Sequence, residues 1–364
     1  MTGTASRQAV RQSILRLAKP YNDPPHRGHQ AYPTPNMSLT NSRVLVIGGA
    51  GFIGSHVVAE LLATDVGTVV VYDNFARGRL EYLAPYLKDP RCSIFPYGGD
   101  IRSTDVLDVA VRDADYVICL AGLWLLHCRD FPRSAFEVNI AGTFNVLEAC
   151  ARHGVKRLIW SSSASVYGDA VETPMTESHP FNNRNFYGAT KIAGEAMATA
   201  FFERYGLSII GLRYMNVYGP HQDQLAAYSG VIPSLLNAIE GGTSPVINGD
   251  GSQSYDFLYV EDAARCNVLA LESPVPFGMY NVGTGVRTSI RELCDLILEL
   301  TRSSVTVSYQ PYAPEDARAL VTERVGATEK AQRDLGFRYR YDLRSGLERL
   351  IAWRTRSGLP SLQS

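Results

Sequence analysis

Short, wholly apolar runs recur along the first two thirds of the chain and alternate with segments of helical periodicity. Runs such as Val44–Ile47 contain no polar position, which is typical of strands that are buried on both faces of a sheet. Strands that alternate with helices need crossover connections, and these favour a parallel, doubly wound sheet. The pattern predicts strands at 44–47, 68–72, 93–97, 116–120, 157–160 and 207–212, and helices at 52–63, 132–153 and 187–205.

The pattern loosens beyond about Tyr214, where glycine, proline and tyrosine become frequent. We expect this half to form a smaller, mixed α/β lobe over the end of the sheet, with amphipathic helices at 289–299 and 344–354. The predicted division is a sheet domain at 43–212, to which later segments return, and a lobe formed mainly by 213–364.

The first 42 residues differ from the rest of the chain. Four basic side chains precede the first acid, Asp23, and five prolines between Pro20 and Pro35 break any helix that begins upstream. We interpret 1–42 as a disordered extension, in which 5–19 could form a short amphipathic helix. The segment has no apolar h-region of a secretory signal, whereas an arginine-rich and acid-poor start is also typical of transit peptides.

Composition narrows the classes of function. Across 364 residues the hydrophobic share is 45% and the formal net charge is −1, so the chain is globular and has no bulk electrostatic reason to bind nucleic acid or an anionic membrane. No apolar stretch reaches the roughly 18 residues that span a bilayer. Six scattered cysteines form no C-x-x-C pair, which argues against a metal site and favours reduced, buried thiols in the cytoplasm.

A glycine-rich turn follows the first predicted strand and opens the first helix. Its glycines fit both G-x-G-x-x-G and G-x-x-G-x-x-G spacings. Such a turn needs glycine because it is tight, because its backbone approaches a pyrophosphate, and because the helix packs close to the strand. The helix N-terminus then offers free N–H groups to the phosphates. This context predicts a Rossmann-type dinucleotide site that involves Gly48, Gly51, Phe52, Ile53 and Gly54.

Asp73 ends the second predicted strand, 19 residues after Gly54. A carboxylate at this point can accept both ribose hydroxyls of NAD and would repel the additional phosphate of NADP, so we expect NAD. Arg77 and Arg79 nearby are the feature that would favour NADP. Loops at the carboxyl ends of the strands should also reach the cofactor, which adds as candidates Asn74, Asp100, Ile101, Leu120, Ala121 and Gly122.

Tyr187 and Lys191 lie four residues apart in a segment of helical character, so their side chains should share one helix face. An ammonium beside a phenol favours the phenolate, which can exchange a proton with a substrate hydroxyl. Ser163 should follow the strand that precedes this helix, where its hydroxyl could bond the same substrate oxygen. These three residues form the predicted catalytic group.

The order of these motifs resembles the extended short-chain dehydrogenase/reductase family. The resemblance rests on the glycine turn, Asp73, the segment Ser161–Gly168, the tyrosine–lysine pair and the segment Leu212–Asn216, and it covers roughly residues 43–350. Within that family the chain most resembles the nucleotide-sugar 4-epimerases of the UDP-galactose 4-epimerase type. The resemblance implies NAD as cofactor, a nucleotide-diphosphate sugar as substrate, and a homodimer.

The resemblance also implies roles for single residues. Tyr187 would be the acid/base, Lys191 would bind the nicotinamide ribose as well as tune the phenol, and Ser163 would orient the sugar hydroxyl. Asn139 matches a helix asparagine that the family places behind the active site, and Tyr214 would lie near the nicotinamide.

Departures from the family pattern affect the substrate side. The stretch 163–165, Ser-Ala-Ser, carries neither the Asp-Glu pair of nucleotide-sugar dehydratases nor the glutamate of the related decarboxylases, which favours epimerisation at C4 through a transient 4-keto sugar. Tyr255 stands where such epimerases often place an arginine, so the diphosphate could be bound by Tyr255, Arg318 or Arg324. A bulky apolar loop that holds Trp124 should lie close to the sugar. The substrate candidates are Trp124, Ser165, Asn216, Tyr255 and Arg318.

Two other functions stay open at this point. One is a dehydrogenase, reductase or other sugar-modifying enzyme with net redox chemistry. The other is a non-catalytic NAD-binding scaffold, against which the intact group of Ser163, Tyr187 and Lys191 argues, because a scaffold has no need of all three.

Overall fold

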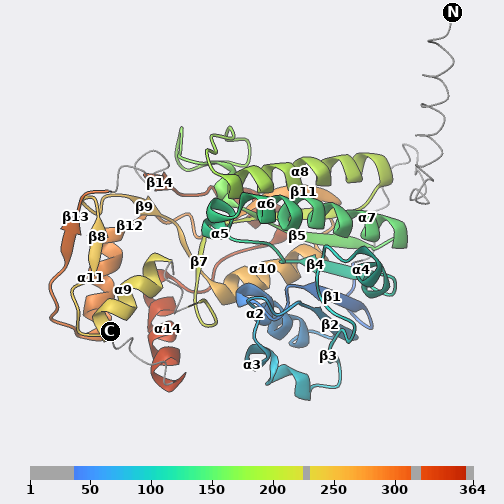
Figure 1. Ribbon diagram of the computed structural model, residues 1–364, viewed down its shortest axis with the longest axis horizontal. Helices are drawn as coiled ribbons and strands as arrows, with labels where there is room; N and C mark the ends of the chain where they lie inside the picture. The colour runs from blue at the N-terminus through green and yellow to red at the C-terminus, as the bar shows by residue number, and fades with distance from the viewer. Residues whose placement is uncertain (1–36, 224–229, 313–320, 358–364) are drawn as a thin grey trace, which may run out of the picture.

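The computed structural model describes residues 37–223, 230–312 and 321–357 (Figure 1). Its centre is a sheet of seven parallel strands in the order β11-β6-β5-β4-β1-β2-β3, which confirms the predicted Rossmann-type fold. The strands are β1 Arg43–Ile47, β2 Thr68–Tyr72, β3 Cys92–Ile94, β4 Tyr116–Cys119, β5 Arg157–Ser163, β6 Ile209–Tyr214 and β11 Phe277–Val282.

Helices cover both faces of this sheet, and each face has its own apolar core. One core joins the sheet to α2 (Phe52–Leu62) and α10 (Val260–Glu272), and the other joins it to α4 (Thr104–Val111), α7 (Thr143–His153) and α8 (Phe186–Tyr205). Both faces are therefore buried, which explains why the strands are apolar throughout instead of alternating.

The strand order reverses between β1 and β4. From β1 the chain first proceeds outward through β2 and β3, and it then returns to add β4, β5 and β6 on the other side. Loops at the carboxyl ends of β1 and β4 therefore diverge to opposite faces of the sheet. This topological switch point is where doubly wound sheets bind their ligands.

The smaller lobe lies at the left of Figure 1 and has a third apolar core. Ser289 begins its helix α11 with a capping box, in which its hydroxyl accepts the N–H of Glu292 and the Glu292 carboxylate accepts the N–H of Ser289. Its elements are β7 Asn216–Tyr218, α9 Val231–Glu240, β8 Val246–Asn248, β9 Ser254–Tyr255, β10 Phe257–Tyr259, β12 Thr288–Ser289, α11 Ile290–Thr301, β13 Ser308–Gln310, β14 Glu323–Arg324 and α14 Leu343–Ser357. The helix α13 Glu329–Leu335 returns to the sheet, where Ala331 and Leu335 join the core that contains α2 and α10.

The helix predicted over 132–153 is interrupted. The chain forms α5 (Leu125–Asp130), α6 (Pro132–Ala135), a π-helical segment over Phe136–Gly142 and then α7. A π-helical turn holds an additional residue, so it changes the direction in which the following side chains point. The segment holds Asn139, whose side chain bonds Leu123 and Thr190, and the periodicity of apolar residues does not report such contacts.

Other elements differ from their predicted bounds in ways that neighbouring strands explain. β5 continues to Ser163, because residues 161–163 pair with Leu212–Tyr214 on β6 in spite of their polar side chains. The strand β11 and the helix α10 had no counterpart in the sequence prediction. β11 follows the whole of α9 and α10 in the chain and reaches the sheet edge only through its pairing with β6.

Residues 37–42 pack against the start of the sheet. Leu39 is buried in the core that contains α2, Thr40 bridges Val66, and the carbonyl of Ser42 accepts the N–H of Thr68 at 3.0 Å. These six residues are ordered because they cover the start of the first two strands. Residues 1–36, with the helix predicted at 5–19, lie outside the described residues.

Two further observations bear on the environment of the chain. Across the described ranges, no helix has both the length and the apolar character that crossing a bilayer requires. All six cysteines are buried and unpaired.

A buried ion pair fastens α8 to the sheet. Nη2 of Arg213 on β6 lies 2.6 Å from Oε2 of Glu195 on α8, and Ser162 on β5 donates to Oε1 of the same carboxylate at 2.6 Å. Arg213 also donates to the Tyr167 hydroxyl, which in turn donates to Asn281 on β11. Burial disfavours the charged guanidinium, but the hydrogen bonds and the carboxylate outweigh that effect and raise the pKa of Arg213.

We predict that Glu195→Gln lowers the free energy of unfolding by about 3 kcal/mol, because it leaves the Arg213 charge buried without its counter-ion. Urea unfolding followed by circular dichroism measures this loss. Glu203→Gln is the matched control, since Glu203 lies on the same helix but is exposed, and a change of less than about 0.5 kcal/mol is expected there. Equal losses in the two variants would contradict the structural role of the pair.

A cluster of rings joins α2 to the loop that follows β7. Nδ1 of His221 lies 2.9 Å from the Ser55 hydroxyl, and the His221 ring stacks on Tyr82 with 4.1 Å between centroids. The ring of His56 lies 4.9 Å away. Burial, and secondarily the neighbouring His56, lower the pKa of His221 to about 4, and burial also lowers the pKa of His56. Both rings are therefore neutral in the folded protein at pH 7.

This cluster predicts a loss of stability in mild acid. An unfolded histidine has a pKa near 6.5, so between about pH 6.5 and 4 the unfolded chain binds more protons than the folded one, and stability falls as the pH falls. Between these pH values the free energy of unfolding should therefore fall by about 2–3 kcal/mol less in His221→Gln than in the unaltered protein. Chemical unfolding at pH 6.5 and 4.5 measures it for both proteins, and identical pH dependences would show that His221 contributes nothing.

Candidate active site

The glycine turn Gly48–Gly54 connects the end of β1 to the start of α2. Gly48 has a φ of +81°, and a Cβ on Gly54 would collide with the Gly48 carbonyl oxygen, so both positions require glycine. Gly51 begins the helix in extended conformation without a side-chain cap, which leaves the first helical N–H groups free. Phe52 and Ile53 form the first helical turn. The turn therefore fits a pyrophosphate against the helix N-terminus.

Asp73 lies beside this turn, directly after β2. Its two carboxylate oxygens accept the N–H groups of Ala50 at 2.9 Å and Phe75 at 2.8 Å. Burial raises the pKa of Asp73, and these two hydrogen bonds act in the opposite direction. Each oxygen keeps a further lone pair, so the carboxylate could accept the two hydroxyls of a ribose.

The loops after β3 and β4 differ in how open their candidate cofactor residues are to a ligand. Asp100 is held by an ion pair with Arg102 at 2.6 Å, and this hydrogen bond, with Asn74 contributing, lowers the pKa of Asp100. Ile101 is buried beneath Gly142. The loop after β4, with Leu120, Ala121 and Gly122, is more open and lies against the glycine turn, because a Cβ on Gly48 would stand only 2.8 Å from the nitrogen of Ala121.

Tyr187 and Lys191 share one face of the first turns of α8, as predicted from their spacing. Nζ of Lys191 lies 5.6 Å from the centroid of the Tyr187 ring and 5.1 Å from that of Trp160. It donates to the carbonyl oxygen of Ser161 at 2.6 Å, and the lysine side chain is buried. An ammonium has three hydrogens, so two remain for other partners.

Ser163 lies at the carboxyl end of β5, where the strand leads into a short 3-10 turn. Its Oγ accepts the N–H of Ser165 at 3.1 Å, so its own hydrogen remains available to a further acceptor. The start of α8 approaches this turn closely, because a Cβ on Gly188 would collide with the carbonyl oxygen of Ser165. Ser163 and Tyr187 are therefore brought to the same end of the sheet.

Asn139 is buried behind the Tyr187–Lys191 pair. Its Oδ1 accepts the N–H of Leu123 at 2.7 Å, and its Nδ2 donates to the carbonyl of Leu123 at 3.0 Å and to the hydroxyl of Thr190 at 3.1 Å. A Cβ on Gly122 would lie 3.4 Å from Oδ1 of Asn139 and 3.7 Å from Nζ of Lys191. The π-helical segment thus aims Asn139 at the loop after β4 and at α8, which lets the two pack together.

One cofactor candidate and two substrate candidates form hydrogen bonds within the protein. The Tyr214 side chain is buried between the sheet and α10 and donates to Asn267 at 3.0 Å. The side chain therefore points away from the expected nicotinamide position, and only the main chain of Tyr214, at the end of β6, lies on that side. Asn216 donates to the carbonyl of Asp256 at 3.1 Å. Tyr255 donates to the carbonyl of Val321 at 2.9 Å. Arg318 lies outside the described residues.

Trp124 begins α5 next to the loop after β4, and the guanidinium of Arg77 lies over its ring at 4.7 Å. Arg77 also forms an exposed ion pair with Asp223 at 3.1 Å. Arg77 is one of the two arginines that would favour NADP, and its guanidinium contacts an acid and an aromatic ring instead of facing open solvent alone.

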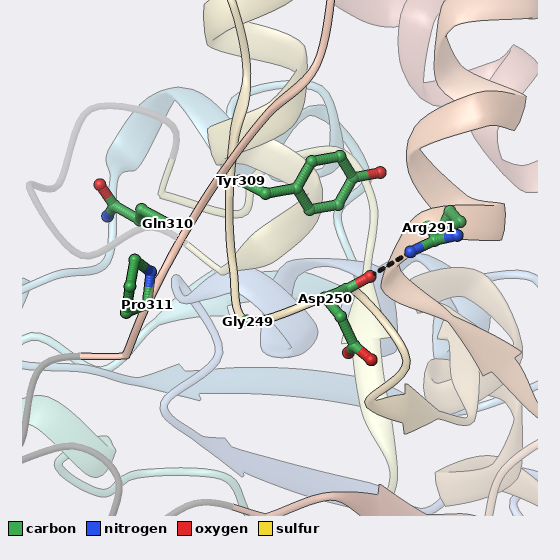
Figure 2. Close-up of a pocket in the computed structure, with 6 residues that line it drawn as sticks. All are labelled: Gly249, Asp250, Arg291, Tyr309, Gln310 and Pro311. Atoms are coloured by element: carbon green, nitrogen blue, oxygen red, sulfur yellow. Dashed lines mark hydrogen bonds between the residues drawn. The ribbon is translucent and has the colours of Figure 1, made fainter.

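A pocket of about 420 Å³ lies apart from this group, in the smaller lobe (Figure 2). Nη2 of Arg291 donates to the carbonyl of Asp250 at 2.6 Å, and its guanidinium lies 5.6 Å from the ring of Tyr309. None of the predicted site residues lines it, so we do not include it in the candidate site. Its lining consists of Gly249, Asp250, Arg291, Tyr309, Gln310 and Pro311.

The sequence prediction did not include Glu195 and Arg213, whose ion pair holds the helix of the catalytic group against the sheet. Glu195 lies one helical turn after Lys191 on α8, and its partner Arg213 is the single charge in the apolar strand β6. An arginine in such a strand requires a buried acid, and that was the available signal. No comparable pattern in the sequence predicted that the Thr190 hydroxyl accepts a hydrogen bond from Asn139. Among the described residues, no group of three or more histidine, cysteine or acidic side chains could hold a metal ion.

Comparison with known proteins places this arrangement in a family. The model of the NAD dependent epimerase/dehydratase family matches residues 44–283. A putative UDP-glucose 4-epimerase of Methanocaldococcus jannaschii is 32% identical over 314 residues, which are 85% of this chain and 97% of that protein. A dTDP-glucose 4,6-dehydratase of Actinoplanes is 29% identical over 85% of this chain and 97% of its own.

Solved structures agree with this placement. A UDP-N-acetylglucosamine 4-epimerase of Methanobrevibacter ruminantium, in complex with UDP-N-acetylmuramic acid, is 33% identical with a TM-score of 0.81 over 87% of this chain and 99% of that one. A Thermus thermophilus UDP-glucose 4-epimerase in complex with NAD is 31% identical with a TM-score of 0.76 over 87% and 100% of the two chains. The chain therefore belongs to the NAD-dependent epimerase/dehydratase family, of the extended short-chain dehydrogenase/reductase type, and its cofactor is NAD.

Proposed function

We propose that the protein epimerises a nucleotide-diphosphate sugar at C4 through a transient 4-keto sugar. The observation that carries the proposal is the grouping of Ser163, Tyr187 and Lys191 at the carboxyl end of the sheet, next to the loop after β4. Known relatives support a 4-epimerase-like enzyme but include a dehydratase. The choice between these reactions therefore rests on the residues that this chain carries at the site.

The residues after β5 favour epimerisation over elimination or decarboxylation. Ala164 and Ser165 fill the 3-10 turn and offer no carboxylate as a further acid or base. Without such a group, Tyr187 can exchange a proton at one hydroxyl, but this turn supplies no carboxylic acid to protonate a leaving hydroxyl.

In this proposal Tyr187 takes the proton of the sugar 4-hydroxyl and later returns it. The Ser163 hydroxyl donates to the same oxygen and orients it, and the Lys191 ammonium beside the Tyr187 ring uses its remaining hydrogens to bind a ribose. NAD, when bound, supplies the acceptor and then the donor of a hydride at C4. Holding the reacting oxygen between the two hydroxyl groups of Tyr187 and Ser163 is the main contribution of the protein.

We assign the remaining candidates to cofactor and substrate on the same basis. For the sugar and its diphosphate we propose Trp124, Ser165, Asn216, Tyr255 and Arg318, most of them from the 213–364 lobe or the loop after β4. For NAD we propose Gly48, Gly51, Phe52, Ile53, Gly54, Asp73, Asn74, Asp100, Ile101, Leu120, Ala121, Gly122, Asn139, Tyr187, Lys191 and Tyr214, the last through its main chain.

We also propose that the enzyme is a homodimer of the cytoplasm. Phe136 and Phe144, on the segment from α6 to α7, leave 51% and 43% of their surfaces exposed, which is unusual for large apolar side chains and suits a covered face. Six buried, unpaired cysteines suit a reducing compartment. Sedimentation equilibrium would test the dimer, and a monomeric mass at micromolar concentration would exclude it.

Tyr187→Phe tests the assigned acid/base. Loss of the hydroxyl should lower kcat at least about 100-fold, because no other group can exchange the proton, while the amount of NAD that copurifies stays unchanged. Turnover and released NAD are measured on the same preparation. Tyr205→Phe makes the same chemical change at the far end of α8 and should leave turnover intact. Near-normal turnover by Tyr187→Phe would exclude this residue as the acid/base.

A panel of UDP-, GDP-, CDP- and dTDP-sugars tests the reaction itself. We expect one pair of C4 epimers to interconvert, from either side, with no lasting rise in absorbance at the NADH band, because the hydride is returned within each turnover. Products are separated by chromatography. Stoichiometric NADH would instead assign a dehydrogenase, and products that lack water or carbon dioxide would assign elimination or decarboxylation.

A further inference from the structure

The contact between Arg77 and Trp124 joins two loops whose strands are not neighbours in the sheet. Arg77 lies in the loop after β2 and Trp124 follows the loop after β4, and the guanidinium lies 4.7 Å from the centroid of the tryptophan ring. The strand order β4-β1-β2 puts β1 between them, and all three strands are parallel, so their carboxyl ends share one edge. A contact between the two outer loops therefore passes over the end of β1, where the glycine turn begins.

Both loops also rest directly on the glycine turn. On one side, a Cβ on Gly78, the neighbour of Arg77, would stand 2.8 Å from the Cβ of Ala50. On the other side, a Cβ on Gly48 would stand 2.8 Å from the nitrogen of Ala121. The turn is thus held between the two loops, and the contact of arginine and tryptophan closes over it. The helix N-terminus that fits a pyrophosphate opens toward this same edge of the sheet.

The smaller lobe attaches to the same arginine. Asp223 lies in the segment that follows β7, and its Oδ2 is 3.1 Å from Nη2 of Arg77. The same segment is fastened to the first turns of α2, because Nδ1 of His221 lies 2.9 Å from the hydroxyl of Ser55. Arg77 therefore links the loop after β2 to the loop after β4 and to the smaller lobe at once.

We propose that Arg77, Trp124 and Asp223 form a strap over the pyrophosphate of bound NAD, and that this strap must open before the dinucleotide enters or leaves. The contacts that close it are weak one by one. The ion pair leaves 44% and 40% of its two side chains exposed, and the other contact is a single cation over a ring. Such contacts can break and re-form while both loops stay folded. The cation covers one face of the indole and leaves the opposite face for the sugar contact proposed above.

A strap of this kind suits a cofactor that stays bound through a whole turnover. In the proposed reaction the hydride returns from the reduced cofactor to the sugar, so a dinucleotide that left too early would strand a 4-keto sugar. The strap also gives Arg77 a role other than binding the additional phosphate of NADP. It depends on NAD, the cofactor of the family, and not on which sugar reaction follows.

The test measures how fast the NAD-loaded protein releases NAD, by adding excess fluorescent etheno-NAD and following its incorporation. Equilibrium dialysis against stepped NAD concentrations gives Kd. Arg77→Gln removes both contacts of the strap, and Asp223→Asn removes the ion pair alone. Arg133→Gln is the matched control, because Arg133 has the same two kinds of contact within one continuous segment, an ion pair with Glu137 at 3.0 Å and the ring of Phe136 at 5.9 Å. An unchanged melting temperature shows that each variant is folded.

We expect Arg77→Gln to release NAD about 5- to 20-fold faster, Asp223→Asn to release it about 2- to 5-fold faster, and Arg133→Gln to release it at the unaltered rate. Kd should change less than the release rate, because the same contacts must break when the dinucleotide enters. Added salt screens the exposed ion pair, so it should speed release more from the unaltered protein than from Asp223→Asn.

Three results would overturn the strap. Release from Arg77→Gln at the unaltered rate would show that nothing has to open there. A rise in Kd as large as the rise in release rate would assign Arg77 to direct binding of the dinucleotide. Equal acceleration in Arg133→Gln would assign the effect to the loss of surface charge. None of these measurements needs turnover, so an error in the proposed reaction would appear in the product assay and leave the release rates unaffected.

Discussion

The buried pair of Glu195 and Arg213 is the contact on which the catalytic geometry depends. Glu195 belongs to the same helix as Tyr187 and Lys191, and Arg213 belongs to the strand beside the one that ends at Ser163. Ser162, on the strand β5 that ends at Ser163, donates its hydroxyl hydrogen to the Glu195 carboxylate at 2.6 Å. A charge pair out of water tolerates little displacement, because each charge would lose its oppositely charged partner. The helix therefore cannot slide along the sheet without a large cost.

Close approaches of backbone bring the other segments to this point. At Gly54 the helix α2 meets the glycine turn, and at Gly188 the helix α8 meets the turn after β5, in both cases without room for a side chain. Gly122 lies where Asn139 and Lys191 converge. Packing of this kind removes water from the site, which strengthens each remaining polar contact.

The charges of the site are unevenly distributed between its two ends. At the glycine turn the carboxylate of Asp73 faces the proposed ribose position, held by main-chain N–H groups. At the smaller lobe the guanidinium of Arg324 has no acid partner among the residues that the structure describes. The two ends of the site therefore carry opposite charges, an acid beside the glycine turn and a base beside the smaller lobe.

The amino-acid sequence alone determined those features whose causes are local. Apolar runs such as Val44–Ile47 indicated strands buried on both faces, the glycine spacing indicated the phosphate turn, and the four-residue interval from Tyr187 to Lys191 indicated a shared helix face. Each depends on residues within a few positions of one another, so periodicity and steric demand suffice to recognise it.

Only the tertiary structure decided the features that join distant segments. Asn139, in the π-helical segment, bonds a loop 16 residues away, Glu195 meets Arg213 across 18 residues, and Tyr167 meets Asn281 across 114. The same holds for Tyr214, whose side chain turns into the core to bond Asn267. Such partners are selected by which segments become neighbours in space. Arg213 in an apolar strand indicates that a buried acid exists, but no pattern along the chain says which residue supplies it.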